Sequence, residues 1–302
     1  LERTLQALTL SAVAVSLYGV YQYVSGASGA SAWVDSTMFT GISTRVYSTL
    51  ENPNVLAGYL LLATPFVFAL AITGEGQLTR IFYALCGAIL LLCMVLTYAR
   101  GGWLGLIVAA AVMLVFIDRR FILVGAVGLV ALYFLTPQVI LDRFLSIGDL
   151  SDGSTSYRLT IWLGTLSMLR DYWYSGIGPG VAAFNQVYPL YSYNTAVAQH
   201  SHNLFLQIMC DSGIVGLLTF SALLFTAFRL IAGTIRRLNV THARRPASFY
   251  YLAAGAASLS GFLVQGMADY SFYNYRVTFV FWAILGIVAA ACRLAISKDG
   301  ER

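Results

Sequence analysis

Long apolar segments, separated by short stretches that hold most of the charged residues, constrain the fold of this chain more than any other feature. Eight such segments lie at about 5–24, 55–73, 80–98, 101–117, 121–136, 208–228, 249–267 and 277–292. A helix of about 17–25 apolar residues can cross a hydrocarbon layer about 30 Å thick. The composition agrees, because 59% of the residues are hydrophobic and only 10% are charged. The pattern predicts an all-α, polytopic membrane helix bundle with about eight transmembrane helices.

The basic residues predict the orientation, because Lys and Arg near span ends are retained on the cytoplasmic side. With the N-terminus inside, the inner connections hold twelve of them, namely Arg3, Arg80, Arg119, Arg120, Arg229, Arg236, Arg237, Arg244, Arg245, Arg293, Lys298 and Arg302. The outer connections hold six, namely Arg45, Arg100, Arg143, Arg158, Arg170 and Arg276. The net charge of +5 is therefore mainly a topology signal and does not indicate a nucleic-acid partner.

The loop lengths predict three parts: five spans in residues 1–136, an extracytoplasmic loop in 137–207, and three spans in 208–302. The chain starts at Leu1 without Met or a cleavage site, so no targeting peptide is predicted and the chain is expected to be a fragment. The four cysteines form neither a disulfide framework nor a metal-ligand cluster: Cys86 and Cys93 lie about 10 Å apart along one helix.

Two outer segments, about 25–54 and 137–207, are too long to be simple turns. In the first, Asn54 is predicted to cap the second span. In the second, "STSYRLTIWLGTLSMLRDYW" predicts a helix with a Ser/Thr cap and an apolar stripe of Leu159, Trp162, Leu163, Leu166 and Leu169. This helix lies either in the outer membrane interface or against the protein core. The glycines at 176, 178 and 180 predict a tight turn.

Arginines on the outer side are candidates for binding a phosphorylated substrate, because topology disfavours positive charge there. Arg100 stands in "TYARGGWLG", where two glycines would let the backbone approach a ligand; Arg45, Arg158 and Arg276 also lie at outer edges. A guanidinium offers a planar fork of donors that matches phosphate oxygens, so these four residues together would suit a pyrophosphate. Alternatively, each pairs with Glu51, Asp152, Asp171 or Asp269, although Arg100 has no outer acid near it in the sequence.

Two of the three histidines stand together in "QHSHN", where the outer loop re-enters the membrane. His200 is equally well a packing residue. A neutral His202, oriented by Asn203, would take a proton from an acceptor hydroxyl as its oxygen attacks. With arginines holding a pyrophosphate leaving group, no metal or other cofactor is needed.

Four segments, in order, resemble the O-antigen ligase and polymerase (Wzy_C-type) family of bacterial envelope proteins. They are "RVYSTLENPNVLAGYLLLATPF", "TYARGGWLGL", "SYRLTIW" and "HSHNLFLQIMCDSGIVGLL", and the resemblance extends from about residue 15 to 290. It implies a membrane glycosyltransferase that passes a glycan from undecaprenyl pyrophosphate to a hydroxyl of a glycan, lipid or protein. The reaction would take place on the outer face of the cytoplasmic membrane, in lipopolysaccharide or polysaccharide synthesis.

Carried over by motif, the resemblance implies that His202 is the base, that Arg100 and Arg158 bind the pyrophosphate, and that Arg45 assists; His200, Asn203 and Arg276 are further candidates for substrate binding. The family is expected to have about twelve spans, which agrees with a truncated chain. Asp211 stands where the family pattern has Glu. The motifs do not separate ligases from polymerases.

The alternative function is a transporter of inorganic carbon or another small anion, which would need ionisable groups within the spans.

Overall fold

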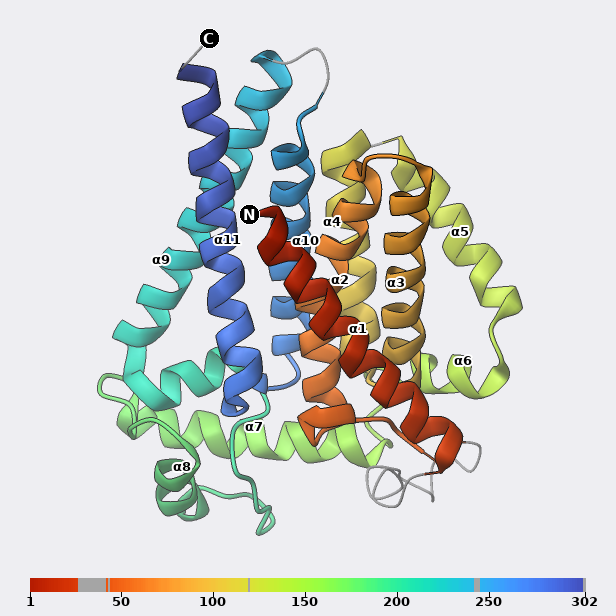
Figure 1. Ribbon diagram of the computed structural model, residues 1–302. Coiled ribbons are helices and arrows are strands. Elements are labelled where there is room, and N and C mark those ends of the chain that lie inside the picture. Colours follow the sequence, from red (N-terminus) through yellow and green to blue (C-terminus); the bar gives the residue numbers. More distant parts are fainter. Residues whose placement is uncertain (27–41, 43, 119, 242–244, 301–302) are drawn as a thin grey trace.

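The structure of the protein is a computed structural model that describes residues 1–26, 42, 44–118, 120–241 and 245–300 (Figure 1). The described residues form helices joined by turns, and no strand occurs among them. The predicted all-α bundle is confirmed. Its α-helices are α1 (Glu2–Ser25), α2 (Pro53–Thr73), α3 (Gln77–Leu96), α4 (Arg100–Asp118), α5 (Phe121–Leu135), α6 (Gln138–Leu145), α7 (Gly153–Tyr172), α8 (Val181–Val187), α9 (Leu204–Thr241), α10 (Ala247–Gly266) and α11 (Tyr275–Gly300). Three short 3₁₀ helices complete the described elements: η2 (Ser48–Leu50), η3 (Tyr188–Leu190) and η4 (Ser271–Tyr273).

Seven of these helices are long and apolar enough to cross a membrane: α1, α2, α3, α4, α9, α10 and α11. The eighth predicted span, 121–136, is a helix, α5, but it has only 15 residues. That length rises about 22 Å, which is less than the hydrocarbon thickness. Pro137 explains the early end, because a proline disfavours helical backbone in the residue before it, and Thr136 is extended.

The connections alternate between two ends of the bundle (Figure 1). The N-terminus, the α2–α3 turn and the end of α11 lie toward one end, whereas α6, α7 and α8 lie at the other. Arg100 begins α4 and Arg158 lies within α7, so both belong to the helices that meet at the second end. Which end faces the cytoplasm stays a prediction.

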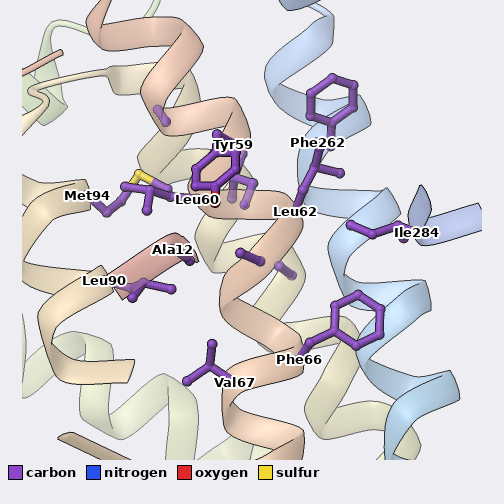
Figure 2. Packing of buried hydrophobic residues seen from close by; sticks show 14 of the residues in the cluster. Ala12, Tyr59, Leu60, Leu62, Phe66, Val67, Leu90, Met94, Phe262 and Ile284 are labelled. Atoms are coloured by element: carbon purple, nitrogen blue, oxygen red, sulfur yellow. The ribbon is translucent and has the colours of Figure 1, made fainter. Parts of the chain in front are cut away.

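Helix α2 lies at the centre of the bundle and is the most buried of the seven spans. In Figure 2 its side chains Tyr59, Leu62 and Phe66 lie between residues of α3 and residues of α10 and α11. Helix α4 packs closely on α10 through two glycines: a Cβ added at Gly105 would lie 2.5 Å from the carbonyl oxygen of Gly261. Small residues of this kind let membrane helices approach each other. The start of α4 and the end of α10 are thereby held together.

Two helix caps differ from the sequence prediction. The side chain of Asn52, not Asn54, caps α2 by accepting from the Asn54 backbone N–H at 2.8 Å, because Pro53 occupies the first helical position. Helix α7 is capped by Asp152 instead of a Ser or Thr, with the carboxylate accepting from the Thr155 backbone N–H at 2.9 Å. Asn54, which is not the cap, has its side chain available for other contacts, whereas the Asp152 carboxylate is held at the start of α7.

Helix α7 packs on the protein through one face, as one of the two alternatives for its sequence predicts. Ile161, Met168 and Leu169 are buried in a small core with Phe184 and Tyr188, so one face packs on the protein. The leucines of the predicted stripe divide, because Leu169 belongs to this core whereas Leu159, Leu163 and Leu166 are exposed. An exposed apolar row on a helix at the end of the bundle suits the membrane interface, which stays a prediction.

Helix α9 is broken at Gly213, where the backbone has φ 64° and ψ −165°. The predicted tight turn at Gly176, Gly178 and Gly180 packs into this break, and all three glycines have positive φ. The backbone N–H of Ile177 donates to the Cys210 carbonyl at 2.6 Å, and that of Ile214 donates to the Trp173 carbonyl at 2.8 Å. The first segment of α9, which follows the histidines, is therefore fixed to the end of α7.

Candidate active site

Four arginines from separate parts of the chain line one cavity of about 470 Å³ near the end of the bundle that carries α7. Arg45 precedes η2, Arg100 begins α4, Arg143 ends α6 and Arg158 lies in α7. Asp269, between α10 and η4, lines the same cavity. Arginines far apart in sequence would not be gathered here by packing alone, because each brings a charge that must leave bulk water.

Arg100 is bound by an acid that its own sequence neighbourhood does not contain. Its Nη2 lies 2.5 Å from Asp152 Oδ2, and its Nη1 donates to the carbonyl and hydroxyl oxygens of Ser146, both at 2.8 Å. The alternative in which an outer arginine pairs with Asp152 therefore holds for Arg100, because the loop after α6 folds back onto the start of α4. Gly102 also serves packing, since a Cβ added there would lie 2.6 Å from that of Ala57.

Asp152 is buried, and burial by itself opposes ionisation. The hydrogen bonds from Arg100 and from Thr155 outweigh that effect and hold the pKa of Asp152 below its usual value. Its other oxygen, Oδ1, lies 4.0 Å from Nη1 of Arg143. One ionised carboxylate therefore lies between two guanidinium groups.

Arg45 is fixed by neutral acceptors. Its Nε donates to the Thr97 carbonyl and its Nη2 to Asn54 Oδ1, both at 3.0 Å. Burial, followed by the positive charges of Arg143, Arg158 and Arg100, lowers the pKa of Arg45 to about 9. This repulsion among the arginines indicates a site that would be stabilised by an anion.

Arg158 faces the cavity from the second turn of α7. Its Nη1 donates to the Ser154 hydroxyl at 2.6 Å, whereas its Nε is buried with no hydrogen-bond partner among the described residues. A buried donor without an acceptor is unfavourable, and a bound anion would relieve the cost. The position of Arg158 and its unpartnered Nε therefore make it a candidate for binding an anion in the cavity.

The two histidines lie beside the cavity and contact each other, with ring centroids 4.2 Å apart. His202 has a left-handed backbone, with φ 50°, and its backbone N–H donates to Nδ1 of His200 at 3.2 Å. Its own Nδ1 lies 3.5 Å from Asp269 Oδ1. Asp269 lines the cavity and His202 does not, so the carboxylate connects the base candidate to the arginines.

The acid that contacts His202 is also ionised. Burial opposes ionisation of Asp269, but the contact with His202 and the charge of Arg158 outweigh it, so the pKa of Asp269 lies well below its usual value. The sequence prediction treated Asp269 only as an available acid for an arginine. No local signal marks it as a partner of His202, because the two are separated by the whole of α9 and α10.

Residues 84–221 match the family model described as O-antigen ligase. This match supports the O-antigen ligase family for the region. The region contains Arg100, Arg143, Arg158, His200 and His202, and it holds three of the four segments that carried the resemblance, which is confirmed over these residues. Among curated proteins, none matches the chain.

Asn203 does not orient His202 in this O-antigen ligase region, contrary to the prediction. Its Oδ1 accepts from the backbone N–H groups of Phe205 and Leu206, both at 3.0 Å, and its Nδ2 donates to the Met267 carbonyl at 2.7 Å. Asn203 is therefore the cap of α9, which is the role that its amide is best suited to. The imidazole instead lies beside Asp269, whose Oδ1 is 3.5 Å from its Nδ1.

His200 is buried and stacks on Tyr273, with ring centroids 5.0 Å apart and an interplanar angle of 17°. Burial, helped by the nearby His202, lowers the pKa of His200 to about 4. The ring is neutral at neutral pH and accepts the backbone N–H of His202. This geometry favours the packing interpretation of His200.

Arg276 is not brought to the cavity. Its guanidinium lies 3.9 Å from the Glu51 carboxylate, contacts the Thr49 carbonyl, and has a side chain that is 41% exposed. Of the four arginines that the sequence prediction placed at one cavity, Arg45, Arg100 and Arg158 line it and Arg276 does not. Arg143, which the sequence analysis did not select, takes the place of Arg276.

The described residues contain no group of three or more His, Cys, Asp or Glu side chains that could hold a metal ion. The cationic side chains that line the cavity are guanidinium groups, supplied by α4, α6, α7 and the loop before η2.

Proposed function

We propose that the protein transfers a glycan from undecaprenyl pyrophosphate to an acceptor hydroxyl on the outer face of the bacterial cytoplasmic membrane. The observation that carries the proposal is the cavity lined by four arginines, next to a histidine that contacts an ionised aspartate. The match to the O-antigen ligase family supports a transfer of this general type. The acceptor, a glycan, lipid or protein, is left open because no feature of the described residues selects one.

The arginines would bind the pyrophosphate and stabilise the charge that develops on it. Arg158 offers a buried Nε with no acceptor among the described residues, and Arg100 is held in place by Asp152. In a site with little water, such preorganised donors stabilise a leaving group strongly, since they need not reorient as charge develops. The arginines thereby supply the neutralising charge that a divalent metal supplies in other transferases.

His202 would act as the general base. With its Nδ1 proton directed at Asp269, its Nε2 is the atom that can accept the proton of the acceptor hydroxyl. That oxygen attacks the anomeric carbon, a new C–O bond forms, and the bond from this carbon to the pyrophosphate oxygen breaks. The electron pair stays on the departing undecaprenyl pyrophosphate, and the proton stays on His202 until solvent removes it.

Purified protein in liposomes, with undecaprenyl-pyrophosphate-linked glycan and acceptor, tests the proposal directly. We expect transfer by the wild type, and a loss of about 10²–10⁴ in rate for His202→Ala. Arg100→Lys and Arg158→Lys should fail nearly as badly as the alanine variants, because Lys keeps the charge but loses the planar fork. The exposed Arg170, on the same helix as Arg158, is the matched control and should tolerate Lys.

Adding EDTA distinguishes the two possible sources of the positive charge that neutralises the leaving group, which are arginine side chains and a divalent metal ion. Transfer should continue at an unchanged rate in EDTA if guanidinium groups neutralise the leaving group. Loss of transfer in EDTA that added Mg²⁺ restores would refute the arginine mechanism, and no transfer by wild-type protein with any offered acceptor would refute the function.

A further inference from the structure

A chain of two hydrogen bonds connects the residue before His202 to the first segment of α9. The backbone N–H of Ser201 donates to Oε1 of Gln207 at 2.7 Å, and Nε2 of Gln207 donates to Oδ1 of Asp211 at 2.8 Å. Ser201 and Gln207 are both buried, so water does not readily replace either bond. The reaction proposed above gives no role to Gln207 or Asp211.

Glutamine is suited to the middle of this chain, because one end of its amide accepts a hydrogen bond and the other end donates one. The backbone N–H of Ser201 can only donate, so it needs the amide oxygen, and Oδ1 of Asp211 accepts from the amide nitrogen. An ionised glutamate at the same position would have no donor, so it could serve Ser201 but not Asp211.

Asp211 lies where three parts of the chain meet. Beside its carboxylate is the backbone N–H of Gly180, in the turn after α7. The hydroxyl of Tyr270, the residue after Asp269, donates to its Oδ2 at 3.5 Å. Asp211 therefore connects the first segment of α9 both to that turn and to the loop that holds Asp269.

The other end of the chain is next to the strained backbone of His202. Its φ of 50° is unfavourable for a residue with a side chain and persists only where the surrounding contacts enforce it. Ser201 supplies two such contacts, since its N–H donates to Gln207 and its hydroxyl donates to the Asn203 carbonyl at 2.9 Å. Without the bond to Gln207, the backbone could relax and move the imidazole away from Asp269.

We propose that Gln207, held by Asp211, is a positioning residue that keeps the imidazole of His202 beside Asp269. The inference rests on the proposed function, because it takes His202 as the base. Neither Gln207 nor Asp211 lines the cavity that holds the arginines. The pair should therefore affect kcat and leave the KM for the donor unchanged.

Reversing the polarity of the pair tests the inference, with transfer measured in liposomes at varied concentrations of undecaprenyl-pyrophosphate-linked glycan. In Gln207→Glu the new carboxylate faces Asp211 without a donor, so kcat should fall at least about tenfold at an unchanged KM. Asp211→Asn alone keeps an acceptor for Gln207 and should stay within a few-fold of the wild type. In the double variant Gln207→Glu/Asp211→Asn the new amide donates to the new carboxylate, so kcat should recover.

Gln138 and Asp142 in α6 offer a matched control. Nε2 of Gln138 donates to Oδ1 of Asp142 at 2.7 Å, across the same spacing of four residues, but this pair is exposed. Gln138→Glu should therefore transfer glycan like the wild type. This control separates the positioning role from the general effect of a Gln–Asp pair on a helix.

Recovery of kcat in the double variant supports the inference, whereas a loss in Gln207→Glu that the double variant does not reverse refutes it. A raised KM refutes the positioning role, because the donor site would then be disturbed as well. If melting temperatures show that Gln207→Glu does not fold, Gln207→Leu gives a second test, and wild-type kcat in either variant refutes the inference alone. If wild-type protein transfers no glycan to any offered acceptor, the proposed function fails and the inference fails with it.

Discussion

Asp269 contacts the imidazole of His202 and also lines the cavity that holds the arginines. Under the proposed function, replacing its carboxylate should therefore affect kcat and KM differently. Asp269→Asn keeps the shape but removes the carboxylate charge that orients the imidazole, so kcat should fall at least about tenfold. The same change removes a negative charge from the cavity, so KM for the pyrophosphate donor should stay level or fall.

Steady-state kinetics with varied donor measure both constants. A fall in kcat with an unchanged or lower KM supports a positioning role for Asp269. A higher KM at unchanged kcat would instead show that the carboxylate serves donor binding, and the assignment to His202 would be wrong. Arg170→Gln, on the exposed side of α7, is the control for a change of one charge.

His200 leads to a prediction about stability at acid pH. The pKa of His200 is lowered to about 4, mainly by burial, whereas in an unfolded chain it would be about 6.5. Between these two values the unfolded state binds a proton that the folded state does not, so stability falls as the pH is lowered from 6.5 toward 4. His200→Gln keeps a hydrogen-bond acceptor without this titration.

Thermal unfolding in detergent at several pH values measures the effect. The melting temperature of the wild type should fall more steeply between pH 6.5 and 4.5 than that of His200→Gln, whatever the variant's value at pH 7.5. Parallel curves for the two proteins would show that the buried ring does not contribute to the acid sensitivity.

At the scale of the element, the break in α9 determines where the histidine segment lies. A Cβ at Gly213 would lie 1.9 Å from the Tyr174 carbonyl oxygen, and its φ of 64° is unfavourable for any residue with a side chain. Gly213→Ala should therefore abolish transfer, and it should lower expression, because the contact between α9 and the turn after α7 cannot form.

Gly233, on the same helix, offers a matched control. A Cβ there would meet nothing within 4 Å, so Gly233→Ala should keep full transfer and stabilise the helix by about 0.5–1 kcal/mol. Transfer and melting temperature, measured on both variants, test the pair. Normal transfer by Gly213→Ala would mean that α9 can continue as a straight helix without displacing His202.

For the whole molecule, the basic residues predict that the end with α7 faces outward, and labelling of single cysteines tests this orientation. Ser151, next to the cavity, and Glu75, in the α2–α3 turn, are both exposed and lie at opposite ends. In a background without the four buried native cysteines, Ser151→Cys should react with an impermeant maleimide added from outside, and Glu75→Cys should not. The reverse pattern would place the arginine cavity in the cytoplasm.

The sequence predicted the features that depend on local pattern. Apolar length predicted each of the seven long apolar helices among the described residues, and the motifs selected Arg100 and Arg158, which line the cavity, and His202, which contacts Asp269 beside it. The sequence did not predict contacts between residues that are far apart in the chain. Asp152 contacts Arg100 although α5 and α6 lie between them in sequence, and Asp269 contacts His202 although α9 and α10 lie between them. Arg143 was missed for the same reason, since the last turn of an eight-residue helix carries no sign of the cavity beside it.

The glycine contact between α4 and α10 has a consequence for how such a protein could change its substrate. Gly105 and Gly261 hold these helices so closely that neither can accept a larger side chain without displacing the other. Arg100 and Asp269, at the adjoining helix ends, are consequently constrained in their separation, and with them the part of the site that would bind the pyrophosphate of the proposed donor. Under the proposed function, new glycans or acceptors would be accommodated more easily by residues of α6, α7 and α8 other than Arg143 and Arg158, because their replacement leaves that separation unaltered.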